Sequence, residues 1–485
     1  MSRFQISKKK LRANTPMIAV MVSAVLGLLS SNILLTLAAL LLLVVFVKLF
    51  WRPGEPPVLF YMMGYQLLQA TILIFYADLK NWPLEAMDKS QFVVEATWLS
   101  MFGLLVLALG LRLGAGPSYA PVSEPLIASH VSQLSVRRLF VACLLAIGFA
   151  SLMGIAAYTV RGLSQPILTA SLLHWVVVYI FAYTVLAQRR GYGALALIFM
   201  IEILIGFLGF FSDFKTILIV FLLAALAAPS ALRGVRLRTA LAISACILIL
   251  GVAWTGIKID YRDFLNQGSR QQVVLVTVGE RVEKLAELIA DLDSEKIAQS
   301  TEDLVHRLTY VHYFGESMHI VPERIPYENG KLWWEAVQNF LMPRILNPDK
   351  KVLDDSIRTA HYTGIRVAGA DDGTSISLGY IAESYIDFGP VLMAMPLFIW
   401  GFFVGKVYRT LVRSTAYPIF GYASAAVLIS IGASVLEQSN VKMVGGMVLG
   451  FVLFYFIQKL FAKKILVMLA LRRKSTSQHI AQGPT

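Results

Sequence analysis

Apolar runs of about 20 residues recur along the whole chain, and this pattern constrains the fold more than any other feature. The first run lies near residues 15–29 and the last near residues 443–461. A helix needs a run of this length to cross the hydrocarbon core of a bilayer. Hydrophobic residues make up 57% of the chain and charged residues 15%, whereas soluble domains have roughly 45–50% and about 25%. We therefore expect an all-α polytopic membrane protein.

The pattern predicts about twelve transmembrane helices. They cover residues 15–29, 32–50, 57–76, 92–111, 139–160, 167–187, 194–211, 216–228, 239–256, 390–407, 418–436 and 443–461. No small-residue cleavage site follows the first run, so we expect that helix to be retained. Cys143 and Cys246 both lie inside predicted helices, where we expect them to pack rather than to form a disulfide or bind a metal.

The distribution of Lys and Arg predicts an orientation for these helices. If the N-terminus is cytoplasmic, the cytoplasmic segments carry 24 of the 43 Lys and Arg residues and the short outer loops carry five. This bias follows the positive-inside rule and places both termini in the cytoplasm. The net charge of +13 then reflects orientation and attraction to anionic membrane lipid, not a nucleic-acid partner.

One long polar insert, residues 258–377, interrupts the series of apolar helices. Nine predicted helices precede the insert, which places it on the outer side of the membrane. It carries 14 basic and 19 acidic residues, and apolar spacing predicts that it is mostly helical, with helices at 271–290, 300–320 and 331–341. The chain is thus divided into nine helices (1–257), the insert (258–377), a short segment (378–389), three helices (390–461) and a cytoplasmic tail (462–485).

An outer location for the insert argues against ATP and nucleotide-activated sugars as substrates. The sequence agrees, because it has neither a Walker-type phosphate loop nor a glycine-rich dinucleotide turn after a strand. A catalyst on this side needs a substrate that carries its own activation, as a lipid diphosphate does. Trp333 and Trp334 suit either an anchor at the bilayer interface or a surface that stacks on a sugar.

The segment after the insert places carboxylates next to the membrane. Residues 376–388 have apolar side chains at helical spacing, but Glu383 and Asp387 interrupt them. Such a segment is too polar to face lipid, so we expect a re-entrant or interfacial helix that faces a cavity. Alternatively, it is the first turn of the next transmembrane helix, where acids favour the helix dipole.

Three other ionisable residues, Glu95, Glu202 and His174, lie inside predicted transmembrane helices. Glu202 and His174 are each either a hydrogen-bonded packing group or a functional site, such as a proton site, whereas Glu95 is either solvated near the outer surface or functional. The insert itself contains candidates for binding phosphate. These are Arg324, Arg344, Arg358 and Arg366, with His361 among them. A guanidinium can bind phosphate through two parallel hydrogen bonds, although an arginine in an acidic insert can also pair with a nearby carboxylate.

Two local patterns accompany this layout. One is Phe340-Leu-Met-Pro-Arg-Ile-Leu-Asn-Pro-Asp-Lys350, and the other runs from Gly379 through Glu383 to Phe388-Gly389. Together with about twelve helices and a large outer loop late in the chain, they resemble the Wzy-type O-antigen and capsular repeat-unit polymerases. One departure concerns the turn that often has Ser-Arg in that family, which reads Ser212-Asp-Phe-Lys215 here. Lys215 supplies a charge there without the bidentate geometry of arginine.

The resemblance implies glycosyl transfer between undecaprenyl-diphosphate-linked oligosaccharides at the periplasmic face of a bacterial inner membrane, without a metal or other cofactor. A carboxylate or histidine would take the acceptor proton, and arginines would stabilise the leaving diphosphate. Glu383 is the preferred base, with His361 and Asp387 as alternatives. The expected diphosphate ligands are Arg344 and Arg366, followed by Arg324, Arg358 and Lys215. Expected partners include membrane lipid, a chain-length regulator and a flippase.

Other functions remain open at this point. A ligase that transfers glycan to a lipid or another acceptor would use the same topology and chemistry. A polysaccharide transporter or flippase would use Glu202, Glu95 and His174 as a proton path, but it leaves the long insert unexplained and predicts an inverted repeat. A structural subunit of an export complex would use the insert as a docking surface.

Overall fold

The computed structural model describes residues 30–159, 162–209, 213–228, 233–269, 274–342, 354–369 and 375–470. Every regular element in these ranges is a helix. Before the insert they are α2 (Ile33–Phe50), α3 (Val58–Lys80), η1 (Leu84–Ala86), α4 (Val93–Ala115), α5 (Ala120–Gln133), α6 (Val136–Thr159), α7 (Ser164–Ser171), α8 (Leu173–Gln188), α9 (Tyr192–Leu208), α10 (Phe214–Ala227) and α11 (Arg233–Leu265). The remainder are α12 (Val278–Ala290), α13 (Ser294–Leu308), α14 (Val311–Ile320), α15 (Lys331–Leu341), α16 (Asp355–Thr363), α17 (Tyr380–Leu392), α18 (Ala394–Arg413), α19 (Pro418–Gly432) and α20 (Asn440–Leu469).

Seven spans among the described residues are long and apolar enough to cross a membrane, and the bent pair α17–α18 makes an eighth if it counts as one span. Helices α9, α10 and α19 are also apolar but have only 17, 14 and 15 residues, which is short for a hydrocarbon core of about 30 Å. The predicted helix at 15–29 lies outside the described residues. The all-helical class is confirmed for the described part of the chain, and its long apolar helices fit a multi-pass membrane protein.

Helices α4 and α18 pack backbone against backbone. Each carries two glycines four residues apart, Gly110 and Gly114 in α4 and Gly401 and Gly405 in α18. A Cβ atom added at Gly110 would collide with the backbone oxygen of Phe398, and the other three glycines meet the partner helix in the same way. Transmembrane helices use small residues at this spacing to approach one another closely. This contact fixes the middle of α18, the helix that follows α17 in the chain.

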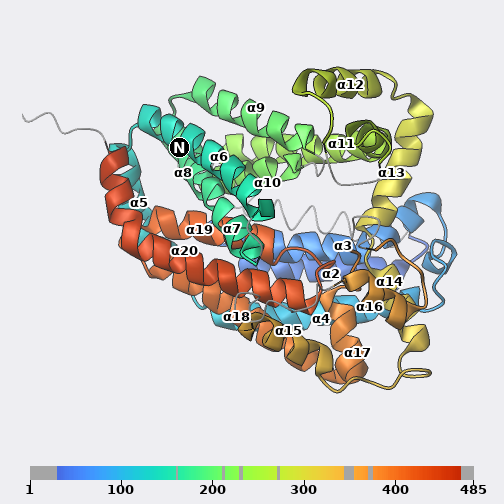
Figure 1. Cartoon of the computed structure of the whole chain (residues 1–485). Helices are drawn as coiled ribbons and strands as arrows, with labels where there is room; N and C mark the ends of the chain where they lie inside the picture. Colours follow the sequence, from blue (N-terminus) through green and yellow to red (C-terminus); the bar gives the residue numbers. More distant parts are fainter. Residues whose placement is uncertain are drawn as a thin grey trace, which may run out of the picture.

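The helices form two groups in Figure 1. One contains α2, α3, α4, α18, α19 and α20, and the other contains α6 and α8 to α12. Helix α8 packs against α6 and α10 in its own group and against α19 in the other, so α8 and α19 join the two. Helices α14 to α17 lie together at the end of the first group (Figure 1).

The insert begins later than the sequence predicts. Its preceding helix, α11, continues to Leu265 instead of ending at residue 256. Helix α12 begins at Val278 and not at residue 271, because Thr277 and Glu280 form a capping box there. The boundaries of α15, Lys331–Leu341, agree with the prediction.

The single helix expected at 300–320 is wrong, because the chain forms two helices there. The first, α13, begins at Ser294, where the Asp293 side chain accepts a hydrogen bond of 2.8 Å from the backbone N of Lys296. It ends at Leu308, and the backbone N–H of Tyr310 then donates a hydrogen bond of 3.2 Å to the backbone oxygen of Gln69 on α3. This tertiary contact separates α13 from α14.

The segment between the helices predicted at 92–111 and 139–160, in which no helix is expected from the sequence, contains a helix, α5. The Glu55 carboxylate lies at its N-terminus and accepts hydrogen bonds from the backbone N–H groups of Tyr119 and Ala120. A carboxylate in this position satisfies donors that a helix leaves unpaired. Tyr408 holds the same carboxylate from α18 at 2.6 Å, so a distant residue stabilises α5.

Helices α17 and α18 are bent by 120° relative to one another. The bend lies at Gly389, whose φ of 74° and ψ of −176° are not helical, and the positive φ favours glycine. Pro390 follows and has no N–H to continue the helical hydrogen bonds. Helix α17 is therefore separate from α18 and is not its straight first turn. A separate helix is what the re-entrant or interfacial interpretation requires.

Candidate active site

Glu383 is a completely buried carboxylate on α17. Its Oε1 lies 3.2 Å from Nη1 of Arg358, and its Oε2 accepts a hydrogen bond of 2.7 Å from the backbone N of Asn440. These donors come from α16 in the insert and from the start of α20. A buried carboxylate is costly without such partners. Glu383 therefore favours the packing of α16 and the start of α20 against α17.

Arg358 is the cation of this site, and its side chain is 13% exposed. Its Nη2 lies 2.8 Å from Oε2 of Glu335 on α15, so the guanidinium bridges Glu335 and Glu383. Burial disfavours the charged guanidinium, but the charges of Glu383 and Glu335 outweigh burial and raise the pKa of Arg358. A guanidinium has five N–H groups, which is more than these two carboxylate contacts use.

Asp387 joins α17 to the insert. Its Oδ1 accepts a hydrogen bond of 3.0 Å from the backbone N of Leu332, and its Oδ2 accepts one of 2.9 Å from the backbone N of Trp333. Asp387 thus caps the N-terminus of α15, a position that suits a carboxylate. Trp333 also donates its indole N–H to Ser384 Oγ at 3.0 Å. Of the paired tryptophans, Trp334 is the exposed one, at 59%.

The segment between α19 and α20 forms the other wall of the site. Ser439 donates a hydrogen bond of 3.0 Å to Asp355 Oδ2, and Nζ of Lys442 lies 2.8 Å from the same oxygen. The side-chain oxygen and nitrogen of Asn440 and the Gln438 Oε1 are buried and have no hydrogen-bond partner among the described residues. Buried polar groups of this kind are usually satisfied, so the start of α20, whose Asn440 backbone N–H binds Glu383, carries unused hydrogen-bonding capacity.

The other predicted residues are more scattered. His361 is exposed on α16, and its ring packs against Tyr362 with 4.7 Å between centroids. Arg324 and Arg366 are exposed, and Lys215 is exposed in the first turn of α10. Arg344 lies outside the described residues. The structure therefore brings together Glu383, Asp387 and Arg358, and of the predicted phosphate ligands only Arg358 is seen to contact Glu383.

A second group of cations was not predicted. Lys258 and Arg262, four residues apart on α11, lie within electrostatic range of Arg307 on α13, and Asp303 offsets part of this charge. Sequence analysis missed the group because it ended the transmembrane helix at residue 256. The i, i+4 spacing of Lys258 and Arg262 is the signal that could have shown them on one helical face.

Arg307 connects this group, named here the α11–α13 basic cluster, to the Glu383 site. The charges of Arg307 and Glu437 both act on Tyr65, and those of Glu437 and Asp355 act on Tyr310. Gln69 on α3 donates to Glu437 at 3.4 Å. Polar side chains within electrostatic range of one another thus extend from the basic cluster to Asp355, in the wall of the Glu383 site.

A comparison with protein families matches residues 63–468 to a family described as a domain of unknown function (DUF8712). The chain belongs to the DUF8712 family. The match extends from within α3 to the end of α20, and it includes Glu383, Arg358 and the α11–α13 basic cluster. Searches of curated proteins and of solved structures each found no match.

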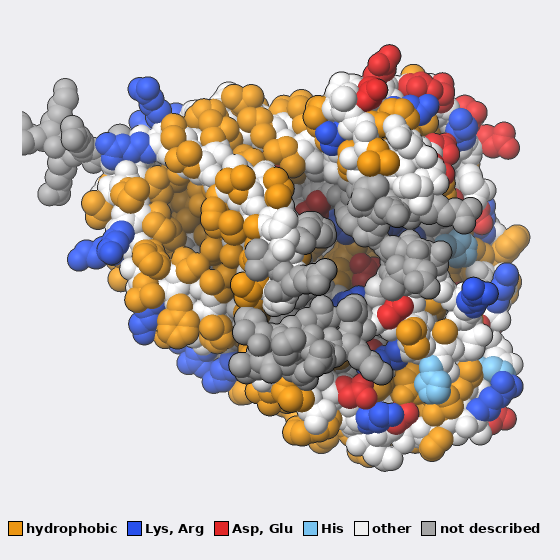
Figure 2. Space-filling model, in the orientation of Figure 1, with side chains coloured by type: hydrophobic (Ala, Val, Ile, Leu, Met, Phe, Trp, Pro, Cys, Tyr) orange, Lys and Arg blue, Asp and Glu red, His pale blue; other side chains and the backbone are white. Residues whose placement is uncertain are grey.

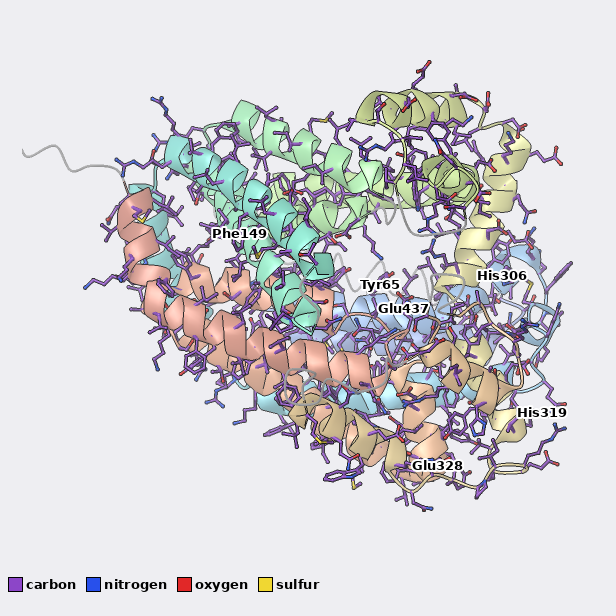
Figure 3. The ribbon with its side chains drawn as sticks, in the orientation of Figure 1. Tyr65, Phe149, His306, His319, Glu328 and Glu437 are labelled. Atoms are coloured by element: carbon purple, nitrogen blue, oxygen red, sulfur yellow. The ribbon has the colours of Figure 1, made fainter. Side chains whose placement is uncertain are left out.

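The surface of this DUF8712 protein is hollowed near the centre of the face in Figure 2, and both acidic and basic side chains are visible inside the hollow. Figure 3, in the same orientation, places Tyr65 and Glu437 in this part of the molecule. Tyr65 and Glu437 therefore lie in the part of the molecule where this face is hollowed.

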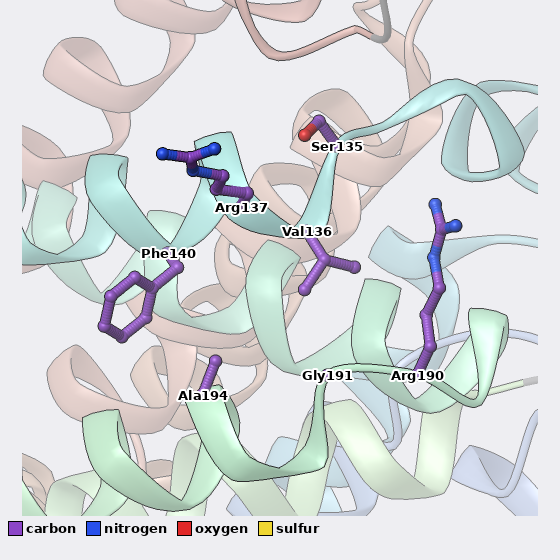
Figure 4. Close-up of a pocket in the computed structure, with 7 residues that line it drawn as sticks. All are labelled: Ser135, Val136, Arg137, Phe140, Arg190, Gly191 and Ala194. Atoms are coloured by element: carbon purple, nitrogen blue, oxygen red, sulfur yellow. The ribbon is translucent and has the colours of Figure 1, made fainter.

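A separate cavity of about 480 Å³ lies at the start of α6 and the turn between α8 and α9. Figure 4 shows its lining residues, Ser135, Val136, Arg137, Phe140, Arg190, Gly191 and Ala194. None of these seven has a carboxylate or imidazole, so this cavity offers no general base. Within the described ranges, no group of three or more His, Cys, Asp or Glu side chains is placed to hold a metal ion.

Proposed function

We propose that this protein is a membrane glycosyltransferase that polymerises undecaprenyl-diphosphate-linked oligosaccharide repeat units at the periplasmic face of the bacterial inner membrane. The observation that carries the proposal is the buried contact between Glu383 and Arg358. It pairs a general base with a phosphate-binding group beneath the outer insert. About twelve spans with cytoplasmic termini, as the positive-inside rule indicates, put this contact on the periplasmic side.

The reaction needs a base and a cation, and this site has both. An acceptor sugar hydroxyl attacks the anomeric carbon of the donor, a new glycosidic C–O bond forms, and the bond to the lipid diphosphate breaks. The hydroxyl proton passes to Glu383, and the leaving diphosphate takes the electron pair. Arg358 stabilises the negative charge that develops on it. No metal or nucleotide takes part.

Substrate binding must free Glu383 before it can accept a proton, because both of its oxygens have donors. A phosphate oxygen that binds Arg358 competes with Glu383 Oε1 for the guanidinium and would release that oxygen to the acceptor hydroxyl. Glu335 Oε2 still pairs with Arg358 Nη2 at 2.8 Å, so the guanidinium stays in place. Binding of the donor diphosphate is thereby coupled to activation of the base.

The α11–α13 basic cluster is suited to a second anionic group. Lys258, Arg262 and Arg307 provide positive charge at the far end of the polar side chains that include Tyr65 and Glu437. Both substrates of a polymerase carry a diphosphate, and the cluster would hold one while Arg358 holds the other. Arg344 and Arg366, the first diphosphate ligands predicted from the sequence, remain predictions.

Deletion of the gene followed by electrophoresis of the lipid-linked and surface glycans tests the function. A polymerase predicts that single lipid-linked repeats accumulate. Long chains that persist without their final acceptor would instead indicate a ligase, and the absence of any outward-facing repeat would indicate a flippase. Complementation with Glu383→Gln should fail to restore chain growth at normal protein level, whereas Glu295→Gln, at an exposed glutamate of the insert, should restore it. Normal chains with Glu383→Gln would exclude Glu383 as the base.

A further inference from the structure

His174 and Glu202 face one another between α8 and α9, away from the Glu383 site. The Nε2 of His174 lies 3.7 Å from the Oε1 of Glu202, and the two side chains are 11% and 5% exposed. His174 stands just after the break between α7 and α8, within a span apolar enough to cross a membrane. Glu202 lies on α9, another apolar helix. Ionisable residues in such helices are costly and usually functional.

The hydrogen bonding of His174 defines its tautomer. Its Nδ1 lies 2.6 Å from the backbone oxygen of Ser171. A carbonyl oxygen only accepts, so Nδ1 carries a proton. In a neutral imidazole, Nε2 then presents a lone pair toward Glu202.

The Oε1 atom of the opposite carboxylate is also uncompensated within the part of the chain that the structure describes. Glu202 Oε1 is buried and has no hydrogen-bond partner among the described residues. An ionised Glu202 beside a neutral His174 would therefore be a buried, unpaired charge that faces a lone pair, which is strongly unfavourable. One proton removes this conflict, either as a carboxylic acid that faces Nε2 or as an imidazolium that faces a carboxylate. A second proton would leave an imidazolium without a counter-charge.

Asp213 provides a connection from this pair to the surface. Gly206 lies four residues after Glu202 and thus on the same face of α9, and its oxygen accepts a hydrogen bond of 3.1 Å from the backbone N of Asp213. Asp213 is exposed in the turn before α10, and its charge acts on Glu202. Thr216 donates to Asp213 Oδ1 at 2.6 Å.

The other titratable or charged groups near the pair are few in the described residues. Cys143 on α6 lies within electrostatic range of Glu202. Lys215 acts on Asp213, and Arg281 on α12 donates to the oxygen of Leu208, at the end of α9, at 2.7 Å. None of these contacts places a fixed cation on Glu202.

We propose that His174 and Glu202 form a site inside the membrane-spanning region that binds one proton and exchanges it with the outer surface through Asp213. The site is independent of glycosyl transfer at Glu383. It gives the protein a way to take up a proton within its apolar helices. Glu95, which the sequence groups with these residues, is exposed in the first turn of α4 and does not belong to the site.

Infrared and NMR spectroscopy of the full-length protein in lipid nanodiscs test this site. The infrared carbonyl stretch of a protonated acid reports on Glu202, and it is assigned to Glu202 because it disappears in Glu202→Gln. The ¹⁵N shifts of the imidazole report on His174 and are assigned in the same way with His174→Gln. Between about pH 6 and about pH 8, the two residues together should hold one proton beyond the one on Nδ1 of His174. An ionised Glu202 beside a neutral His174 would overturn the proposal.

Asp213→Asn tests the exchange route while both residues of the pair stay in place. Because this variant also removes a charge that acts on Glu202, the protonation of the pair is measured in it as well. In this variant the proton should exchange with D₂O severalfold more slowly than in the wild type, and Glu95→Gln serves as the control with unchanged exchange. Equal exchange in Asp213→Asn and wild type would overturn the route. If Glu202→Gln does not fold, the His174 shifts and the Asp213→Asn comparison still decide the outcome.

Discussion

Glu383 and Glu202 are both buried carboxylates in apolar surroundings, but the protein compensates them in different ways. Glu383 has a guanidinium at 3.2 Å and a backbone N–H at 2.7 Å. Glu202 has only an imidazole at 3.7 Å, and its Oε1 lacks a hydrogen bond from the described residues. Arginine is always charged, whereas histidine titrates near neutral pH. The first carboxylate is therefore suited to an ionic substrate, and the second to a proton.

Removal of the fixed cation should have the largest effect on stability. Arg358→Met leaves Glu383 buried beside no counter-charge and should lower the free energy of unfolding by about 3–5 kcal/mol. Chemical unfolding in detergent micelles measures the loss. Arg324→Met, which removes an exposed arginine from the same insert, should change stability little. Equal losses in both variants would show that Glu383 does not depend on Arg358.

Asp387 is a third buried carboxylate, compensated by two backbone N–H groups of α15. Asp387→Ala should destabilise the protein by about 0.5–2 kcal/mol, as expected for loss of a helix cap. Asp387→Asn keeps an acceptor and should cost less while preserving chain growth. If Asp387→Asn abolished chain growth without changing stability, Asp387 would be a catalytic group and not a cap.

The pair His312–Asp88 offers a more exposed version of the His174–Glu202 arrangement. His312 Nδ1 lies 2.8 Å from Asp88 Oδ1. The hydrogen bond to Asp88 raises the pKa of His312 despite partial burial. Burial opposes ionisation of Asp88, but hydrogen bonds from His312 and Ser90 outweigh it and lower the pKa of Asp88.

These shifts predict a pH window for the contribution of this pair to stability. The His312 contribution should be complete below the ordinary histidine pKa of about 6.5 and lost as pH rises through the raised value. The Asp88 contribution should be lost as pH falls through its lowered pKa. Unfolding measured against pH should lose this dependence in His312→Gln but keep it in His319→Gln, whose ring contacts the neutral Gln91. An unchanged profile in His312→Gln would contradict the pairing.

The smallest change is expected at Glu202. The His174–Glu202 pair holds a proton and contains no fixed charge. Glu202→Gln therefore replaces the carboxyl group with a neutral amide and should alter the free energy of unfolding by less than about 1 kcal/mol. Thermal unfolding in nanodiscs, compared with Arg358→Met, measures the contrast. A loss as large as that of Arg358→Met would mean that Glu202 is ionised and held by a charge that the described residues do not show.

Local patterns predicted much of the fold, because helix signals lie in neighbouring residues. Apolar runs located most of the described long helices, α15 has its predicted ends, and Gly389-Pro390 marks the bend between α17 and α18. Tertiary contacts were not visible in the sequence. Helix α5 depends on Glu55, far away in the chain, and the separation of α13 from α14 accompanies a contact with Gln69.

The same limit applies to the candidate site. Sequence analysis selected Glu383 and Asp387 because carboxylates stand out in an apolar segment. It could not assign their roles, since Asp387 caps a helix more than fifty residues upstream and the partner of Glu383 was one of several arginines. The α11–α13 basic cluster escaped notice because it depends on how far α11 extends and on where α13 packs.

The most direct test of the proposed chemistry uses purified protein in nanodiscs with lipid-diphosphate-linked repeat units as both donor and acceptor. The wild type should lengthen the glycan in the presence of EDTA and without nucleotide. Glu383→Gln should reduce the rate roughly 100-fold to 10,000-fold, as expected for loss of a general base, while Glu295→Gln, at an exposed glutamate of the insert, should retain the wild-type rate. Chain growth at the wild-type rate by Glu383→Gln, or none by the wild type under these conditions, would contradict glycosyl transfer at the Glu383–Arg358 site.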